Sequence, residues 1–353
     1  MSAPIPTLVL GGSGYVAGEL LRLIAAHPRF ELAAVMSDSR PGEPVAHAFP
    51  HLASAYGDTR FSSQEDIENH IAHLPAPAVF SAAPHGAAAA LIDALLTKAA
   101  ECGNHARVVD ISADFRYRSA AAFEAIYRQP HRAPARIAEF TCALPEHLRI
   151  LATAHVAHPG CFATATLLAA VPLLALRLTS PRLFVAGITG STGSGRKSVE
   201  GTHHPLRHSD LYAYSALAHR HVPEMQACVR AACGAEVDIA FVPHSGPFAR
   251  GIHVTVQAEL TAAQDTAQVL GALRRFYAHA PFVRVLDQAP RMKDVVASNY
   301  AHLSAVAHGG TVAVLCVIDN LAKGAAGGAL QWMNRMFDLP ETEGLTAPAP
   351  GWT

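Results

Sequence analysis

Short aliphatic runs alternate with longer amphipathic stretches through the first third of the chain. The runs have the length and aliphatic content of buried strands, and they cover residues 7–10, 32–36, 78–82 and 107–111. Two of the intervening stretches, at about 16–26 and 86–100, are helical in pattern. Strands that alternate with helices predict an α/β fold with a parallel sheet and crossover helices.

The pattern changes after about residue 160. Further aliphatic runs predict strands at 183–188, 237–242, 252–258, 301–307 and 311–318. The last two runs are separated by His308-Gly309-Gly310, a hairpin signal that makes these strands antiparallel neighbours. This half therefore predicts a mixed sheet.

Three helices are predicted in the same half. The first is an apolar stretch at 162–176. Thr261 and Gln264 resemble a capping box that opens a second helix, which reaches about residue 278. The third covers about 321–336 and ends before Pro340.

Composition narrows the class of protein. The 353 residues suggest two domains of about 150 residues. Charged residues make up 16% and hydrophobic residues 50%, which excludes a disordered chain. The net charge is −1 and no basic stripe is present, so we expect no nucleic-acid partner. The basic residues are 23 arginines and four lysines, which leaves few candidates for lysine-based catalysis.

The cysteines and the apolar runs indicate a compartment. Six cysteines without CxxC spacing favour free thiols in a reducing environment. The first residues lack the basic start and apolar stretch of a signal peptide. The longest apolar run, 167–178, contains Pro172 and Arg177 and is too short to cross a bilayer. We therefore expect a cytoplasmic protein with no membrane partner.

A glycine-rich turn lies between the first strand and the first helix and reads Gly11-Gly12-Ser13-Gly14-Tyr15-Val16-Ala17-Gly18. Backbone N–H groups at such a helix N-terminus can hold a pyrophosphate, and glycine lets it approach closely. The Gly11-x-x-Gly14-x-x-Ala17/Gly18 spacing is the looser variant found in NADP-dependent folds. We expect Gly11, Ser13, Gly14, Tyr15 and Val16 to contact a dinucleotide.

The end of the second strand chooses between NAD and NADP. A carboxylate there would bind a ribose 2′-hydroxyl, whereas serine and arginine suit a 2′-phosphate. Ser37, Ser39 and Arg40 favour NADP(H), and Asp38 is the dissenting residue, which a solvated loop position would also explain.

Cys161 is the strongest candidate for a nucleophile. Pro159-Gly160 makes a turn directly before it, and the apolar helix follows at once, so Cys161 lies at a helix N-terminus. There the helix dipole favours the thiolate, and we expect a thiol pKa below the ~8.5 of a free cysteine. A thiolate attacks acyl carbons readily. The other five cysteines are read as inert.

Histidines supply candidates for proton transfer. His219 and His221 form a polar cluster just before a proline-started helix, and in an extended segment both would point to the same side. Their spacing does not separate them as proton carrier. The cluster of His203, His204 and His208 lacks the HExxH helical frame, so we expect no metal.

Anion-binding groups occur in three loops. Ser112 and Arg116 follow the fourth strand and suit a phosphate. Arg250 is a candidate for a carboxylate, and either arginine would alternatively serve a structural ion pair. The loop after the strand at 183–188 offers Ser191 and Gly193 for backbone contacts near a cofactor or substrate.

Together these stretches resemble the N-acetyl-gamma-glutamyl-phosphate reductase family, which is grouped with the aspartate-semialdehyde dehydrogenases. The resemblance runs from residue 8 to about 334. It rests on the joint order of short motifs at residues 11–20, 49–52, 84–86, 110–116, 144–146, 159–161, 189–197, 219–224, 243–251 and 319–327.

The resemblance implies two domains. An NADP-binding Rossmann domain would cover 1–157, completed by a C-terminal helix within 320–353. An α+β catalytic domain with a mixed sheet would cover 158–319 and make the contacts of a homodimer or homotetramer.

The resemblance also implies a reaction and its residues. The thiolate of Cys161 would attack a γ-acyl phosphate, and the thioester would be reduced by NADPH to a semialdehyde, as in arginine biosynthesis. His219 or His221 would move protons. Asn320 and Pro84 would face the cofactor, and Arg116 would meet the leaving phosphate.

Two departures concern the substrate. Phe162 stands where the family commonly has tyrosine. Residues 201–207 resemble members that reduce a carrier-protein-linked aminoadipyl phosphate in lysine synthesis, which makes His203 and Arg207 candidate substrate contacts. The N-substituent of the substrate is therefore left open among acetyl, succinyl and a carrier protein.

Three other functions are alternatives to this one. A short-chain reductase needs a Tyr-x-x-x-Lys pair, and none of the four lysines has a tyrosine four residues before it. A non-catalytic NADP-binding redox sensor would leave Cys161 at a helix start without a role. A zinc hydrolase would need the cluster at 203–208 to bind metal.

Overall fold

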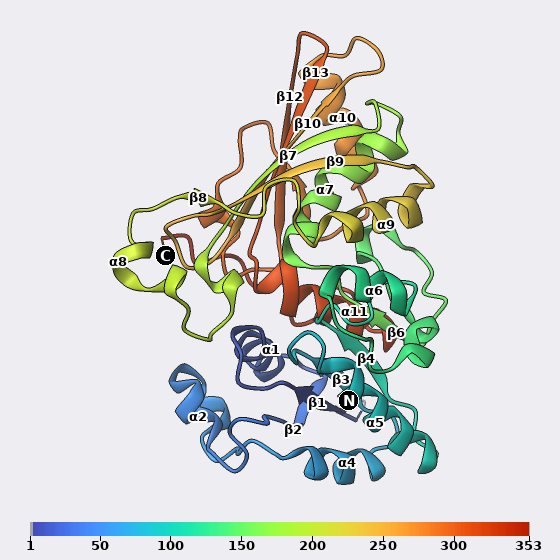
Figure 1. Cartoon of the computed structure of the whole chain (residues 1–353), viewed down its shortest axis with the longest axis vertical. Helices are drawn as coiled ribbons and strands as arrows, with labels where there is room; N and C mark the ends of the chain where they lie inside the picture. The colour runs from blue at the N-terminus through green and yellow to red at the C-terminus, as the bar shows by residue number, and fades with distance from the viewer. Residues whose placement is uncertain (1–2, 353) are drawn as a thin grey trace. The chain divides into compact units, whose positions relative to one another are not determined.

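The computed structural model describes residues 3–352, and these form two compact units (Figure 1). Of the described residues, the first unit contains 3–142, Ile150–His158 and Ala326–Leu345. The second contains Ala143–Arg149, Pro159–Ala325 and 346–352. The predicted functional domains at 1–157 with 320–353, and at 158–319, include residues 1, 2 and 353, which lie outside the described part.

The first unit is built on a parallel sheet. Six strands lie in the order β2-β1-β3-β4-β6-β5, and every neighbouring pair is parallel. The strands are β1 (Ile5–Leu10), β2 (Phe30–Val35), β3 (Ala78–Ser81), β4 (Arg107–Asp110), β5 (Phe140–Cys142) and β6 (His155–Ala157). All four residues of β3 are buried, as expected where helices cover both faces of a sheet. The predicted parallel α/β arrangement is confirmed.

Among residues 3–352, seven helices belong to the same unit. They are α1 (Tyr15–Ala25), α2 (Val45–Ala48), α3 (Ala53–Tyr56), α4 (Gln64–Ala72), α5 (Ala88–Glu101), α6 (Ala120–Tyr127) and α11 (Gly327–Met336), with short 3₁₀ turns at Pro50–Leu52 and Pro134–Glu139. Helix α11, from near the C-terminus, packs on β4 and α1. Because β1, β2, β3 and β4 are parallel, the loops that follow them open at the same edge of the sheet.

The second unit is built on a mixed sheet, as predicted. Seven strands lie in the order β11-β12-β13-β10-β7-β9-β8. They are β7 (Arg182–Thr189), β8 (Tyr212–Ala213), β9 (Asp238–Ser245), β10 (Ile252–Glu259), β11 (Val283–Val285), β12 (Ala301–His308) and β13 (Thr311–Ile318). Gly309 and Gly310 join β12 to β13, and both have positive φ (57° and 80°), as a tight hairpin turn requires.

The helices of this unit are α7 (Cys161–Ala175), α8 (His204–Arg207), α9 (Val222–Cys233) and α10 (Thr266–Phe276). Short turns lie at Pro145–His147, Ser191–Ser194, Glu200–Thr202 and Met292–Asp294, and a π-helix, η7, lies at Ala322–Ala326. Helix α7 packs on β10, β13 and α9 (Figure 1). A helix that is covered on all sides is expected to be apolar on all sides, as α7 is. No helix among residues 3–352 has the length and apolar character needed to cross a membrane.

Two local predictions need correction. The capping box that opens α10 is formed by Asp265 and Gln268, not by Thr261 and Gln264. The Thr261 hydroxyl instead donates to the carbonyls of Arg177 and Leu178. The predicted last helix at 321–336 is not one regular helix, because the π-helix η7 precedes α11.

Candidate active site

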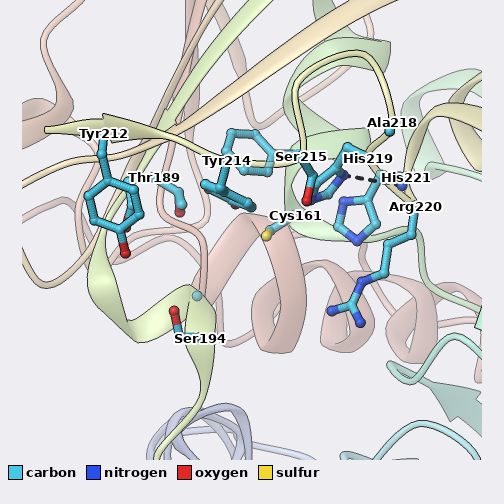
Figure 2. A pocket seen from close by; sticks show the side chains of 13 residues that line it. Cys161, Thr189, Ser194, Tyr212, Tyr214, Ser215, Ala218, His219, Arg220 and His221 are labelled. Atoms are coloured by element: carbon cyan, nitrogen blue, oxygen red, sulfur yellow. Dashed lines mark hydrogen bonds between the residues drawn. The ribbon is translucent and has the colours of Figure 1, made fainter. Parts of the chain in front are cut away.

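A pocket of about 520 Å³ lies in the second unit, around Cys161 (Figure 2). Its lining comes from the start of α7, the end of β7 and the loop after it, β8, and the turn before α9. The lining residues are Cys161, Phe162, Thr189, Gly193, Ser194, Tyr212, Tyr214, Ser215, Ala218, His219, Arg220, His221 and Ser245. The three predicted catalytic side chains are therefore brought to one pocket.

Cys161 is the first residue of α7, as predicted from the Pro-Gly turn before it. Its neighbour Gly160 is the N-cap, and no side chain caps the helix there. Cys161 is partly exposed, whereas Cys228 and Cys316 are buried. Burial raises the pKa of the Cys316 thiol, which keeps it protonated and inert. The structure thus separates Cys161 from the buried cysteines by position and by access to the pocket.

The backbone N–H of Gly160 is held by a buried carboxylate. Glu224 accepts this hydrogen bond at 2.6 Å through Oε1, and its side chain is completely buried. Glu224 lies in the first turn of α9, directly after the histidine cluster. The loop before Cys161 and the histidine loop are therefore connected by this hydrogen bond.

The histidine cluster is a turn and not the extended segment predicted. The backbone N–H of Val222 donates to the carbonyl of His219 at 3.0 Å, and His221 has helical dihedral angles. Both rings nevertheless line the pocket, with centroids 4.7 Å apart in an edge-to-face arrangement (Figure 2). The turn at the start of α9 brings both rings to the pocket.

The hydrogen bonding and the pKa of His219 determine its protonation state. Nδ1 of His219 accepts the backbone N–H of His221 at 3.2 Å, so a neutral His219 carries its proton on Nε2. Burial, assisted by the charge of Arg220, lowers the pKa of His219 to about 4. His219 is therefore neutral near pH 7.

Tyr214 is a pocket residue that sequence reasoning missed. Its ring contacts His219 at a centroid distance of 5.7 Å, and burial and the nearby Cys161 raise the pKa of its hydroxyl. A neutral tyrosine can donate a hydrogen bond into the pocket. No local motif marks this position, and its pocket neighbour Cys161 is far away in sequence.

The glycine–hydroxyl loop after β7 is tied to neighbouring backbone. Ser191 and Thr192 donate to the carbonyls of Phe248 and Ala249. Thr192 also receives a hydrogen bond from the amide of Asn320 at 3.0 Å, and the Asn320 oxygen accepts the N–H of Gly251 at 2.8 Å. Asn320 is buried, and these bonds fix the loop that lines one side of the pocket.

Arg250 forms a two-point ion pair with the buried carboxylate of Asp319, at 2.9 and 3.1 Å. This is the structural ion pair that was the alternative to carboxylate binding. Asp319 also accepts the N–H groups of Leu321 and Ala322, so the pair holds the start of η7.

In the first unit, the glycines of the turn at 11–18 meet different steric requirements. Gly11 has φ +73°, and a Cβ there would lie 2.5 Å from the backbone of Ala83. A Cβ on Gly18 would lie 2.6 Å from the ring of Phe49. Gly14 is the N-cap of α1 and has open space around it, with no side-chain cap on the helix N–H groups. Open space before free N–H groups is what a dinucleotide phosphate needs.

A cluster of three hydroxyls lies beside this turn. Ser37 donates to Ser13 at 3.2 Å, and Ser39 lies 3.4 Å from each of them. Arg40 forms an exposed ion pair with Glu43 at 3.1 Å, which is weak enough to exchange for another anion. Pro84 is exposed in the loop after β3, at the same edge of the sheet.

The predicted phosphate loop after β4 is buried and internally bonded. Arg116 donates to the carbonyls of His158 at 2.9 Å and Ile111 at 2.7 Å. The Ser112 hydroxyl donates to Asp110 at 2.6 Å, and burial raises the pKa of Asp110 to about 6. Phosphate binding by Ser112 and Arg116 stays a prediction, and the contacts observed are structural.

The segment with His203 and Arg207 lies at α8. The Arg207 guanidinium is buried, lies 6.0 Å from the ring of Tyr212, and has no hydrogen-bond partner among residues 3–352. The ring centroids of His204 and His208 lie 5.2 Å apart, with the rings tilted against each other. The described residues contain no group of three or more histidine, cysteine, aspartate or glutamate side chains arranged to hold a metal.

Comparison with known proteins places this fold and site in a class. Residues 7–147 match the semialdehyde dehydrogenase NAD binding domain, and residues 161–320 match the semialdehyde dehydrogenase dimerisation domain. The structure is similar to aspartate semialdehyde dehydrogenase II of Vibrio cholerae, with a TM-score of 0.69 and 13% identity over 96% of this chain and 99% of that one. It is also similar to the Candida albicans enzyme solved with NADP (TM-score 0.65, 12% identity, 95% and 99% covered). The fold is therefore that of a semialdehyde dehydrogenase.

Relatives in sequence identify the family. The N-acetyl-gamma-glutamyl-phosphate reductase of Nitrosococcus oceani is 40% identical over 97% of this chain and 98% of the relative. That of Ectopseudomonas mendocina is 39% identical, with the same coverage. The chain belongs to the N-acetyl-gamma-glutamyl-phosphate reductase family.

Proposed function

We propose that the protein reduces N-acetyl-gamma-glutamyl phosphate with NADPH to N-acetylglutamate semialdehyde and phosphate, a step of arginine biosynthesis. The observation that carries this function is the position of Cys161 at the first turn of α7, in one pocket with His219, His221 and Tyr214. The names of the relatives supply the substrate.

Cys161 is the proposed nucleophile. Its thiol gives a proton to a histidine, and the thiolate attacks the γ-acyl carbon while the C–O bond to phosphate breaks. The product of this half-reaction is a thioester on Cys161 and free phosphate, which takes up a proton from solvent. Bound NADPH supplies the hydride that reduces this thioester.

His221 is the proposed proton carrier, and His219 a hydrogen-bond donor. His219 has Nδ1 occupied and a pKa lowered to about 4, so near pH 7 it offers Nε2–H and accepts protons poorly. His221 protonates the oxygen of the reduced thioester with the proton it took from Cys161. When this thiohemiacetal collapses, the oxygen gives the proton back through His221 to the sulfur, and the semialdehyde leaves.

Stabilisation of the developing oxyanion falls to fixed donors. The backbone N–H groups of the first turn of α7, Nε2–H of His219 and the hydroxyl of Tyr214 are candidates. One such donor contributes about 3 kcal/mol in other acyl-transfer sites.

NADP(H) is the proposed cofactor. Gly11, Ser13, Gly14, Tyr15 and Val16 would hold the pyrophosphate at α1, where the N-cap position is open. The hydroxyls of Ser37 and Ser39, with Arg40, would hold the 2′-phosphate. Pro84, Ser191, Gly193 and Asn320 remain the proposed cofactor contacts near the nicotinamide.

The substrate's anionic groups need partners. Arg220 lines the pocket and is a further candidate for the phosphate, in addition to the predicted Arg116 and Ser112. Arg250, His203 and Arg207 remain proposed contacts for the rest of the substrate. We also propose a homodimer or homotetramer formed by the second unit, and a cytoplasmic location, which suits the six free cysteines.

One assay tests this function and its substrate together. The purified protein is given NADP⁺, inorganic phosphate and N-acetylglutamate semialdehyde, and NADPH formation is followed. We expect phosphate-dependent turnover with the acetyl compound, and at least tenfold lower kcat/KM with succinyl or carrier-linked analogues, about 1.4 kcal/mol of discrimination. Faster turnover of a carrier-linked aminoadipate semialdehyde would replace the proposed substrate, and no phosphate-dependent turnover with any of them would reject the reaction.

A further inference from the structure

Two motifs of the sequence meet in the second unit without a role in the reaction described so far. Lys323, from the π-helix η7, donates to Oε1 of Glu146 at 2.5 Å. The two side chains are 0% and 1% exposed. Lys323 is one of only four lysines in the chain.

A completely buried ion pair is a poor way to gain stability. Removing two charges from water costs about as much as their attraction returns, and apolar replacements are often tolerated. Such a pair is better suited to hold two segments in one arrangement. The question is therefore what Lys323 and Glu146 hold in place.

On the side of Lys323, the ion pair holds the backbone segment that packs against Cys161. Gly324 follows Lys323, and its N–H donates to the carbonyl of Asp319 at 2.9 Å, as in a π-helix. A Cβ on Gly324 would lie 2.8 Å from Cβ and 3.1 Å from Cα of Cys161. The π-helix backbone therefore packs directly on the proposed nucleophile, and π-helical turns are frequent at functional sites.

On the side of Glu146, the backbone segment is anchored to the body of α7. His147, next to Glu146, bonds the Tyr277 hydroxyl at 2.9 Å, and that hydroxyl donates to the carbonyl of Leu168 on α7 at 2.7 Å. The Glu146 segment is thereby fixed to the helix that begins at Cys161. The ring of Phe282 lies 5.7 Å from Nζ of Lys323 and covers the pair.

We propose that Lys323 and Glu146 are positioning residues for Cys161. Their ion pair fixes η7 against α7, so that Gly324 backs the cysteine and keeps its side chain directed into the pocket. The inference rests on the proposed function only in taking Cys161 as the nucleophile.

The first experiment adds one methyl group at Gly324. Gly324→Ala is compared with Gly271→Ala in α10, where a Cβ would meet only the end of the Arg275 side chain at 3.4 Å. A displacement of about 1 Å at a reacting group can cost about 100-fold in rate. We expect kcat of Gly324→Ala to fall by about that factor with KM values nearly unchanged, and Gly271→Ala to resemble the wild type. A wild-type kcat for Gly324→Ala would overturn the proposal.

The second experiment removes the ion pair. A single substitution would leave one buried charge unpaired and is expected to impair folding. The double variant Lys323→Met/Glu146→Leu leaves none, and we expect it to fold, bind NADP⁺ normally and show at least tenfold lower kcat, about 1.4 kcal/mol in the barrier. Leu303→Ala, which truncates a buried residue of β12, controls for a general loss of stability.

The rate at which iodoacetamide alkylates Cys161 separates this proposal from the proposed function. That rate depends on the cysteine and not on the identity of the acyl phosphate. We expect it to change in Gly324→Ala and in the double variant but not in Gly271→Ala or Leu303→Ala. A folded double variant with wild-type kcat and alkylation rate would reject the positioning role, and if it does not fold, the Gly324→Ala comparison decides.

Discussion

The carboxylate of Glu224 holds the backbone N–H of Gly160, 64 residues away in sequence, at 2.6 Å. Gly160 precedes the proposed nucleophile, and Glu224 follows His221 by three residues. This buried hydrogen bond links the loop of the proposed nucleophile to that of the proposed proton carrier.

This relationship predicts a difference between two substitutions of Glu224. Glu224→Gln keeps a side-chain oxygen that can accept the N–H, whereas Glu224→Ala leaves the donor buried without it, a loss of about 1–3 kcal/mol. We expect Glu224→Ala to lower kcat at least tenfold and Glu224→Gln to keep most of it. Glu236→Ala, at an exposed ion pair with Arg230, serves as the control. Equal turnover of the Ala variant and the wild type would show that the bond is not needed.

The histidines are separated by their glutamine variants. His219→Gln keeps an N–H donor near the Nε2 position, so we expect a moderate loss of kcat. His221→Gln removes the proposed proton carrier, so we expect kcat to fall about 100-fold or more. We also expect the pH–rate profile of this variant to lose the limb that reports a histidine. Because His219 has its pKa lowered to about 4, it stays neutral between pH 5 and 8 and should contribute no limb there. The opposite ranking of the two variants would exchange the roles.

Cofactor choice is expected to depend on the hydroxyl cluster. Ser39→Glu places a carboxylate where the 2′-phosphate would lie, and repulsion should lower kcat/KM for NADPH by tenfold or more, about 1.4 kcal/mol. Arg40→Ala should raise KM for NADPH more than KM for NADH, which is measured on the same preparation as an internal control. A wild-type enzyme that uses NADH as well as NADPH would contradict this assignment.

Arg116 and Arg220 are both candidates for binding the phosphate. Arg116 already donates to two carbonyls, so Arg116→Lys is expected to lower the free energy of unfolding by about 1–3 kcal/mol. Arg220 lines the pocket, so Arg220→Ala should raise KM for inorganic phosphate about tenfold, with normal thermal stability. If Arg116→Lys raised KM for phosphate and left the stability unchanged, Arg116 would be the phosphate-binding residue.

Features encoded by neighbouring residues could be predicted from the sequence. Pro159-Gly160 before an apolar helix places Cys161 at a helix start, and the glycine pattern at 11–18 places a phosphate turn after β1; both depend on local geometry alone. Alternating strand and helix patterns were enough to predict the parallel sheet. The capping box of α10 was misplaced because Thr261/Gln264 and Asp265/Gln268 have the same spacing, and only packing selects Asp265.

Contacts between distant segments could not be predicted in the same way. Tyr214, Glu224 and Gly324 meet Cys161 or its neighbour Gly160 only through the folded second unit. The structural partners of Arg250 and Arg116, which are Asp319 and two backbone carbonyls, are also brought to them by the fold. A sequence shows which side chains carry charge but not which charges are already neutralised.

The covalent step on Cys161 is the central claim, and mass spectrometry of the protein after reaction tests it most directly. The protein is mixed with acyl phosphate in the absence of NADPH, quenched in acid and digested, and the peptide that contains Cys161 is examined. We expect an added N-acetylglutamyl group on Cys161 in the wild type, with one phosphate released per acylated site, and no adduct in Cys161→Ser, which should still bind NADP⁺. Acylation of another residue, or turnover by Cys161→Ser close to that of the wild type, would contradict the account.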